Sequence, residues 1–200
     1  MQLSGKISNI LSSNKWYHAT TIDGFLSLKQ HGVIAKYNQG KPLDFGYGFY
    51  LTLNPDMAER YIQRLYEPEE DTFVITEYTF SPLLWFNTEE YNTTVFPKFN
   101  DDFAEFVMTN RMIAPSLEQQ HSYDAIYGVM SDSAPVQLLM NYRLGNITKE
   151  QTLEGLKKSN SMKQLSVHNQ KLCDTLALSR AYQFDFSTDT YIRKELDIHE

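Results

Sequence analysis

The sequence predicts a single α+β domain, and three observations support this prediction. Hydrophobic residues make up 42% and aromatic residues 14% of the 200 positions, which is enough for the core of an ordinary domain. Segments with the alternating pattern of strands are interspersed with segments whose apolar residues have helical spacing. No internal repeat or linker interrupts them. We therefore expect one domain over residues 15–188, with a loose leader at 1–14 and a charged C-terminal tail at 189–200.

The first part of the chain should form a strand followed by a helix. Residues 15–20 are rich in aromatic residues and threonine, which favour strands. Thr20 or Thr21 can cap a helix at about 22–30, where the apolar residues recur at helical spacing. Gly32 stands in the position where helices usually stop.

The middle of the chain should form a helix, a strand and a second helix. Asn54 is a good helix cap, and Pro55 fits the first helical position because its missing N–H is not needed there. Residues 72–80 alternate with period two, as a strand does. Residues 82–95 are expected to form a loop with one short helix, before a helix at about 102–113.

The last part of the chain should alternate between strands and helices. Thr148 and Gln151 have the spacing of a capping box and predict the start of a helix there. The remaining expected elements are strands at 123–130, 162–168 and 178–186, a helix from about 131 to 143, and a short helix after 168.

Charge and composition exclude several classes of protein. The net charge of −7 lacks the broad positive surface of a duplex nucleic-acid binder. Cys173 is the only cysteine, so no intrachain disulfide can form, which fits a reduced cytoplasmic location. No apolar run is long enough for a transmembrane helix, and the N-terminus lacks a signal peptide. The five histidines show no metal-ligand spacing, so we expect no metal.

The stretch 44–52, Asp-Phe-Gly-Tyr-Gly-Phe-Tyr-Leu-Thr, joins two glycines to a β-favouring run. Gly46 and Gly48 can adopt positive φ or let another molecule approach the backbone closely. This pattern fits a loop that cradles a planar or phosphorylated molecule. It equally fits a tight turn or β-bulge filled with core aromatic side chains.

A second stretch, Trp16-Tyr17-His18-Ala19-Thr20, sets a histidine among apolar and aromatic residues. The two stretches, in this order, resemble the ADP-ribosyltransferase fold of the diphtheria-toxin and poly(ADP-ribose) polymerase type. That family has a His-Gly-Thr/Ser motif at the end of its first strand and Phe-Gly-x-Gly-(Ile/Phe)-Tyr at the start of the next. The segments 15–32 and 45–51 follow this template.

The chain is also similar to a bacterial family of unknown function with the signature Asp-Phe-Gly-x-Gly-Phe-Tyr-x-Thr. Three further segments carry this likeness: Phe-Val-x-x-Asn-Arg at 106–111, Tyr-Asp-x-Ile at 123–126 and Gln-x-Ser at 164–166. The resemblance therefore covers residues 15–170. It implies a split β-sheet core with peripheral helices, and NAD as substrate without a metal.

The resemblance implies roles for residues on both motifs. His18 matches the histidine that bonds the adenosine-side ribose. Ala19, followed by Thr20, stands where the family has the glycine whose backbone holds the nicotinamide carboxamide, and this backbone contact requires negative φ at Ala19. Tyr50 matches the tyrosine that stacks on nicotinamide. Tyr61 falls where the family has a second stacking aromatic residue, or it packs in the core.

The third motif of the family departs from the pattern. Gln164 stands where poly(ADP-ribose) polymerases have a catalytic glutamate; its amide can hydrogen-bond a ribose hydroxyl but cannot act as a general base. One explanation is a catalytic set of His18, Tyr50 and Gln164 with an acid from elsewhere, for which Glu105 is the candidate, or Asp44. The others are an acceptor that needs no strong base, and a site that binds without turning over.

The remaining cofactor-binding candidates surround the glycine motif and the later helix. Asp44 can bond a ribose or order the glycine loop, beside Phe45, Gly46 and Gly48. Asn110 belongs to the helix motif. The adjacent Arg111 can grip the NAD pyrophosphate bidentately, or it can pair with Asp124 or another acid.

These motifs predict an NAD-dependent mono-ADP-ribosyltransferase that releases nicotinamide and modifies a macromolecular acceptor, protein or nucleic acid. By analogy within the family, it would be a bacterial toxin or a phage-defence enzyme with a neutralising antitoxin partner. The alternative is an inactive module of the same fold that binds NAD, ADP-ribose or a protein. An RNA 2′-phosphotransferase would need a basic groove and a different His/Arg set, which the sequence lacks.

Overall fold

The structure, a computed structural model, describes residues 3–63, 73–113, 118–131, 135–157, 162–185 and 192–198. Over these residues the chain has the predicted mixed α+β composition, with eight helices and two four-stranded sheets. The chain divides into two compact units. Unit 1 comprises Met1–Ile34, Tyr50–Glu90 and Gln170–Glu200, and unit 2 comprises Ala35–Phe49 and Tyr91–Asn169.

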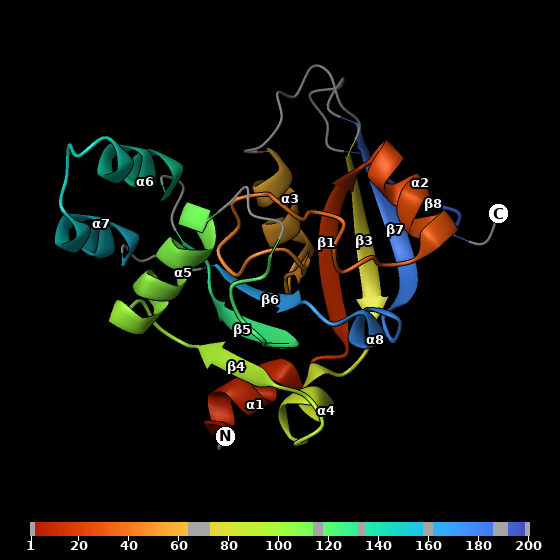
Figure 1. The fold of residues 1–200 in the computed structure, drawn as a ribbon. Coiled ribbons are helices and arrows are strands. Elements are labelled where there is room, and N and C mark those ends of the chain that lie inside the picture. The colour runs from red at the N-terminus through yellow and green to blue at the C-terminus, as the bar shows by residue number, and fades with distance from the viewer. Residues whose placement is uncertain are drawn as a thin grey trace. The chain divides into compact units, whose positions relative to one another are not determined.

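An antiparallel sheet in the order β1-β3-β7-β8 forms the centre of unit 1 (Figure 1). Its strands are β1 (Lys15–Thr21), β3 (Phe73–Thr79), β7 (Ala177–Asp185) and β8 (Ile192–Leu196). In its register, Glu77 of β3 lies opposite Tyr17 of β1 and Arg180 of β7. Neighbouring side chains of a strand point to opposite faces, so the register decides which residues share a face.

Helices cover both faces of the central strand β3. On one face α2 (Ile22–His31) packs Phe25 against Val74. On the other face α3 (Pro55–Gln63) packs Ala58 against Ile75. All residues of β3 except the last are therefore buried, although its sequence alternates in polarity.

The ends of unit 1 are more structured than the sequence predicts. Helix α1 (Gly5–Leu11) forms where a loose leader is expected, because Leu11 is fully buried and Ser4 caps the helix. Strand β8 occupies part of the expected C-terminal tail. Two short helices complete the unit, α4 (Pro82–Phe86) and α8 (Gln170–Cys173).

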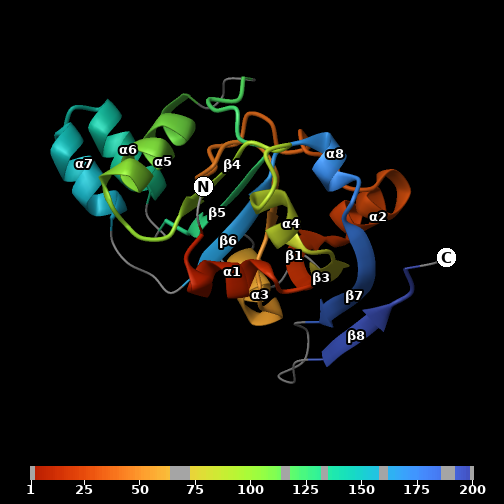
Figure 2. The same cartoon turned by 90° about the horizontal axis from the view of Figure 1, so that it is seen from below.

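The sheet of unit 2 has the order β2-β6-β5-β4. Its strands are β2 (Phe49–Leu51), β6 (Lys163–Val167), β5 (Ala125–Val129) and β4 (Thr93–Phe96). Of β2, Phe49 is the last residue in the first segment of unit 2. Strand β4, which lies where a loop is expected, pairs in parallel with the fully buried β5. The three helices α5 (Asp101–Ile113), α6 (Pro135–Arg143) and α7 (Lys149–Leu156) gather beside one another (Figure 2).

Local signals in the sequence are confirmed where the described residues test them. Thr21 caps α2 by accepting a hydrogen bond from the Gly24 N–H at 3.1 Å. Thr148 and Gln151 form the predicted capping box of α7. Residue 72 of the expected strand and residues 132–134 of the expected helix lie outside the described residues. No helix of the described chain is long and apolar enough to cross a membrane.

Candidate functional site

His18 and Tyr50, the two motif residues of unit 1, are in contact. Tyr17 of β1 forms an isolated bridge with Thr52, the residue after Leu51, and their backbones exchange two hydrogen bonds of 2.8 Å. This places the His18 Nδ1 atom 2.8 Å from the Tyr50 carbonyl oxygen. A carbonyl oxygen can only accept, so Nδ1 carries the proton and Nε2 presents a lone pair. Burial lowers the pKa of His18 to about 4, so the ring is neutral at neutral pH.

The other predicted site residues of unit 1 lie near this pair in the sequence. Ala19 sits in β1 opposite Ile75. Its φ is negative, because no non-glycine residue of the described chain has positive φ, and this meets the condition for a backbone contact with a carboxamide. The Thr20 hydroxyl stands over Gly24 of α2, where a Cβ would lie 2.0 Å from Oγ1. Tyr61, on α3, is 36% exposed, and its stacking on a ligand stays a prediction.

In unit 2, Asp44 is the centre of a buried polar network. Its side chain is 3% exposed. Arg111 donates to Oδ1 through Nε and Nη2, both at 2.7 Å. Ser131 donates its hydroxyl to Oδ1 at 2.6 Å and its backbone N–H to Oδ2 at 2.8 Å. Gln164 donates its amide to Oδ2 at 3.3 Å. The carboxylate is therefore compensated by one full charge and by neutral donors on both oxygens.

This network engages three of the predicted ligand-binding residues. Arg111 pairs with Asp44, an acid inside the fold, and also donates to the Pro42 carbonyl at 2.5 Å. Asn110 donates to the Asp44 carbonyl at 3.3 Å, while its own Oδ1 is a buried acceptor without a partner among the described residues. Gln164, 5% exposed on β6, directs its amide at Asp44. Contacts of these residues with NAD stay a prediction.

Phe45 and Glu105 differ sharply in exposure. The Phe45 ring is fully buried and stacks on Phe96 at a centroid distance of 5.9 Å. This is the core-aromatic role that the glycine stretch left open. The Glu105 side chain is 57% exposed on α5 and pairs with Lys149 at 3.2 Å. Its carboxylate is open to solvent, and a role as the acid stays a prediction.

The glycine loop is filled by side chains of the protein itself. Gly46 has φ 76°, which favours glycine, and a Cβ there would lie 2.7 Å from the Gln119 Oε1 atom. A Cβ on Gly48 would lie 2.6 Å from His168 Nδ1 and 3.0 Å from the Val167 carbonyl oxygen. The two glycines are thus required by close approach of the chain to itself.

Gln119 and two histidines hold the backbone of this loop. Gln119 accepts from the Tyr47 N–H at 3.1 Å and donates to the Tyr47 carbonyl at 3.0 Å. His168 Nδ1 lies 2.5 Å from the same carbonyl, so it is the donor, while its Nε2 accepts from Ser166 at 2.8 Å. His121 Nε2 lies 2.7 Å from the Phe45 carbonyl. We call Gln119, His121 and His168 the loop latch.

Both histidines of the loop latch are held in the neutral form. The His121 Nδ1 atom accepts from the Tyr123 N–H at 3.1 Å, so neither of its nitrogens can take a further proton without losing a bond. Burial lowers the pKa of His121. Burial, with the neighbouring His121 ring, lowers the pKa of His168 to about 3. Sequence reasoning missed this cluster, since its members share no motif or spacing.

Gly48→Ala tests the close packing of the glycine loop. The new methyl group would collide with an imidazole held at both nitrogens and with a backbone carbonyl. We expect the free energy of unfolding to fall by about 1–3 kcal/mol, the usual cost of overpacking. Urea unfolding measures it.

The matched control for Gly48→Ala is Gly5→Ala. Gly5 opens α1, and nothing lies within 4 Å of its Cβ position. This control should leave stability unchanged or raise it by up to about 1 kcal/mol. Equal effects of the two substitutions would contradict the packing described here.

The sheets and the contacts described above define the chain as a mixed α+β protein with a glycine loop anchored from within its own unit. It belongs to the protein family of unknown function DUF3990, which matches residues 29–178, three quarters of the chain. No curated protein and no solved structure matches the chain. Among the described residues, no group of three or more histidine, cysteine, aspartate or glutamate side chains could hold a metal ion.

Proposed function

We propose that this protein is an NAD-dependent mono-ADP-ribosyltransferase that transfers ADP-ribose to a macromolecular acceptor and releases nicotinamide. The observation that carries the proposal is the contact between His18 and Tyr50. Two motifs separated by 32 residues meet through a side-chain nitrogen and a backbone carbonyl 2.8 Å apart. The family resemblance of the two motifs implies that His18 bonds the adenosine-side ribose of NAD and that Tyr50 stacks on its nicotinamide.

The chemistry of these groups suits cleavage of the bond between nicotinamide and ribose. This reaction passes through a cationic, oxocarbenium-like transition state, so an enzyme gains by orienting the nicotinamide and fixing the ribose hydroxyls. The neutral His18 ring can accept a ribose hydroxyl at Nε2, and the Tyr50 ring can stack on nicotinamide. The backbone of Ala19 would hold the carboxamide, with Tyr61 as the second stacking ring.

The mechanism also needs an acidic residue that activates the acceptor. Gln164 cannot be a base, and the Asp44 carboxylate is already bonded by Arg111 and Ser131. Glu105 is exposed, and among the described residues Lys149 is the one lysine that pairs with it. We propose Glu105 as this acid. A nucleophilic acceptor that needs no strong base would make the reaction independent of it.

The test uses purified protein, NAD labelled in its adenylate phosphate and a cell lysate as the source of acceptor. Nicotinamide release and labelled product are followed together, with and without nuclease. His18→Asn retains a donor for the Tyr50 carbonyl but removes the Nε2 acceptor, and we expect it to lower nicotinamide release at least about 100-fold. Tyr50→Ala should do the same, while Tyr50→Phe, which keeps the ring, should remain active.

Melting temperatures of the variants separate lost chemistry from lost folding. Wild-type release with His18→Asn and Tyr50→Ala, both folded, would overturn the proposal. Glu105→Gln tests separately whether Glu105 is the acid. Transfer of ADP-ribose should fall while the melting temperature stays unchanged, since the side chain is mostly exposed. Nuclease sensitivity of the label assigns the acceptor to nucleic acid or protein.

A second candidate is an inactive module that binds NAD, ADP-ribose or a protein. The buried hydrogen bond from Gln164 to Asp44 favours it, because the residue in the third-motif position is used inside the fold. This module would raise its melting temperature with NAD yet release no nicotinamide. For the enzyme, we propose by family analogy a bacterial, cytoplasmic toxin or defence protein with a neutralising antitoxin.

A further inference from the structure

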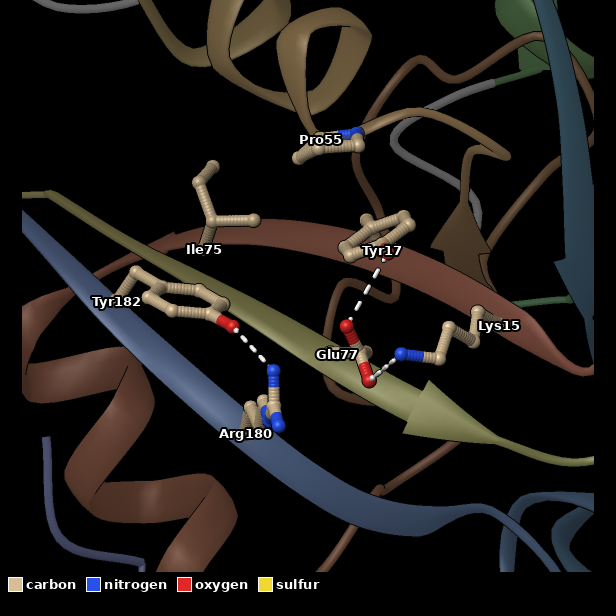
Figure 3. Close-up of a pocket in the computed structure, with 7 residues that line it drawn as sticks. All are labelled: Lys15, Tyr17, Pro55, Ile75, Glu77, Arg180 and Tyr182. Carbon is tan, nitrogen blue, oxygen red and sulfur yellow. Dashed lines mark hydrogen bonds and ion pairs between the residues drawn. The ribbon is translucent and has the colours of Figure 1, made fainter. Parts of the chain in front are cut away.

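Unit 1 contains a pocket of about 280 Å³ on the face of the sheet that α3 covers (Figure 3). Side chains of β1, β3 and β7 line it together with Pro55, the first residue of α3. Tyr17 of β1 points into it. His18 is the next residue of the strand and belongs to the opposite face. The pocket is therefore separate from the His18–Tyr50 pair, and the inference below does not depend on the proposed function.

Glu77 lies at the base of this pocket, and its charge is compensated. Its side chain is 6% exposed. It accepts from Lys15 Nζ at 3.1 Å, from the Tyr17 hydroxyl at 3.1 Å and from the Ser179 hydroxyl at 3.2 Å. Burial raises the pKa of Glu77, but the hydrogen bonds from Lys15 and Tyr17 outweigh it, so its pKa is lower than usual. Glu77 is thus a fixed carboxylate.

Arg180 stands across from Glu77 at the mouth of the pocket. The two residues are opposite each other in the β3–β7 register, and the arginine side chain is 54% exposed. Its Nη1 donates to the Tyr182 hydroxyl at 3.3 Å, and its Nε lies 3.8 Å from Glu195, the outer limit of an ion pair. A guanidinium has five N–H donors, so most of its capacity faces solvent and the pocket.

We propose that this pocket binds a small organic monoanion, a carboxylate, whose charged group meets Arg180 and Lys15. The lining carries two positive charges and one negative charge, and the exposed Glu195, 3.8 Å from Arg180, compensates the guanidinium only weakly, so the pocket keeps an excess of positive charge. A phosphate monoester carries nearly two negative charges, which is more than this excess positive charge can compensate beside the Glu77 carboxylate. A guanidinium also matches the planar carboxylate with two parallel hydrogen bonds.

The rest of the pocket favours a compact apolar body on that carboxylate. Ile75, Pro55 and the rings of Tyr17 and Tyr182 form its remaining walls. The volume of about 280 Å³, against about 150 Å³ for a cavity that holds benzene, suits a small aromatic or branched acid. The N-terminus of α3 begins at Pro55, and its partial positive charge also favours an anion.

The first test compares three probes of one shape against the full chain by ligand-observed NMR and calorimetry. Benzoate carries one negative charge, benzamide is its neutral analogue, and phenyl phosphate carries nearly two. We expect benzoate to saturate the pocket below about 10 mM, the range for so small a ligand, and benzamide to bind at least about tenfold more weakly. Equal binding of benzamide, tighter binding of phenyl phosphate, or no saturation by benzoate would each overturn the proposal.

The second test locates the site with variants at the exposed mouth. Arg180→Gln should weaken the binding of benzoate at least about tenfold. Arg180→Lys should weaken it less, because lysine keeps the positive charge and loses only the two parallel N–H donors of the guanidinium. Glu195→Gln is the matched control: it removes the outer partner of Arg180 and should leave benzoate binding unchanged or stronger. Undiminished binding to Arg180→Gln, with an unchanged melting temperature, would place benzoate elsewhere and overturn the proposal.

Discussion

Replacing Asp44 by alanine should lower the free energy of unfolding by about 3–5 kcal/mol, the usual cost of removing one partner of a buried ion pair. The substitution would leave the Arg111 guanidinium, 13% exposed, without its carboxylate. It would also remove the acceptor of the Ser131 hydroxyl and N–H and of the Gln164 amide. Urea unfolding at neutral pH measures the loss, and its denaturant slope should stay that of the wild type.

Two further variants separate charge, hydrogen bonding and any role in ligand binding. Asp44→Asn keeps the shape and one acceptor oxygen, so its loss should be smaller than that of alanine. Asp124→Ala is the matched control, because the donors to Asp124 within the described part of the chain are neutral, among them the Asn92 N–H at 2.8 Å and the Asn169 amide at 2.7 Å. A loss below about 1 kcal/mol for Asp44→Ala would contradict a structural role. Asp44 would then serve the ligand, and Asp44→Asn should abolish NAD cleavage in a stable protein.

The helices and strands that the sequence predicted are those with their signals close together in the chain. The Thr148 and Gln151 capping box spans a single helical turn, and Gly32, with φ 70°, ends α2 where expected. Strand β4 was missed because its four half-buried residues show no alternation. Helix α1 and strand β8 lie in the predicted loose leader and charged tail, and were missed because what orders them is packing and pairing with distant segments.

The candidate site shows the same limit in its polar contacts. The sequence left Arg111 with several possible partners, and only the fold selects Asp44, 67 positions earlier. Gln119 lies in a polar loop, where nothing marks one glutamine from another, yet it holds the Tyr47 backbone 72 positions away. Glycine requirements were easier to foresee than what fills the space beside them. The local pattern predicted close approach at Gly46 and Gly48, but the approaching groups belong to the chain itself.

The loop latch should make the protein sensitive to acid. In the unfolded chain histidine titrates near pH 6.5, whereas burial lowers the pKa of His121 and lowers that of His168 to about 3. Below about pH 6.5 these two histidines therefore bind more protons in the unfolded chain than in the folded protein. The stabilisation is fully present above that pH and is lost as pH falls toward the folded pKa. Each such histidine contributes a slope of up to about 1.4 kcal/mol per pH unit.

Urea unfolding from about pH 7.5 to about pH 4.5 tests this slope. His168→Asn places an amide where Nδ1 donates to the Tyr47 carbonyl, and His121→Gln places one where Nε2 donates to the Phe45 carbonyl. Both substitutions remove a titrating group. Each should therefore lower the slope of the free energy of unfolding against pH by up to the contribution of one proton. His31→Asn changes an exposed histidine outside the loop latch and is the matched control. His18, whose pKa burial lowers to about 4, retains its share of the slope in all three variants. If the free energy of unfolding falls equally steeply with acid in His168→Asn and His31→Asn, His168 is not held neutral in the folded protein. The loop latch is then not the cause of the acid sensitivity.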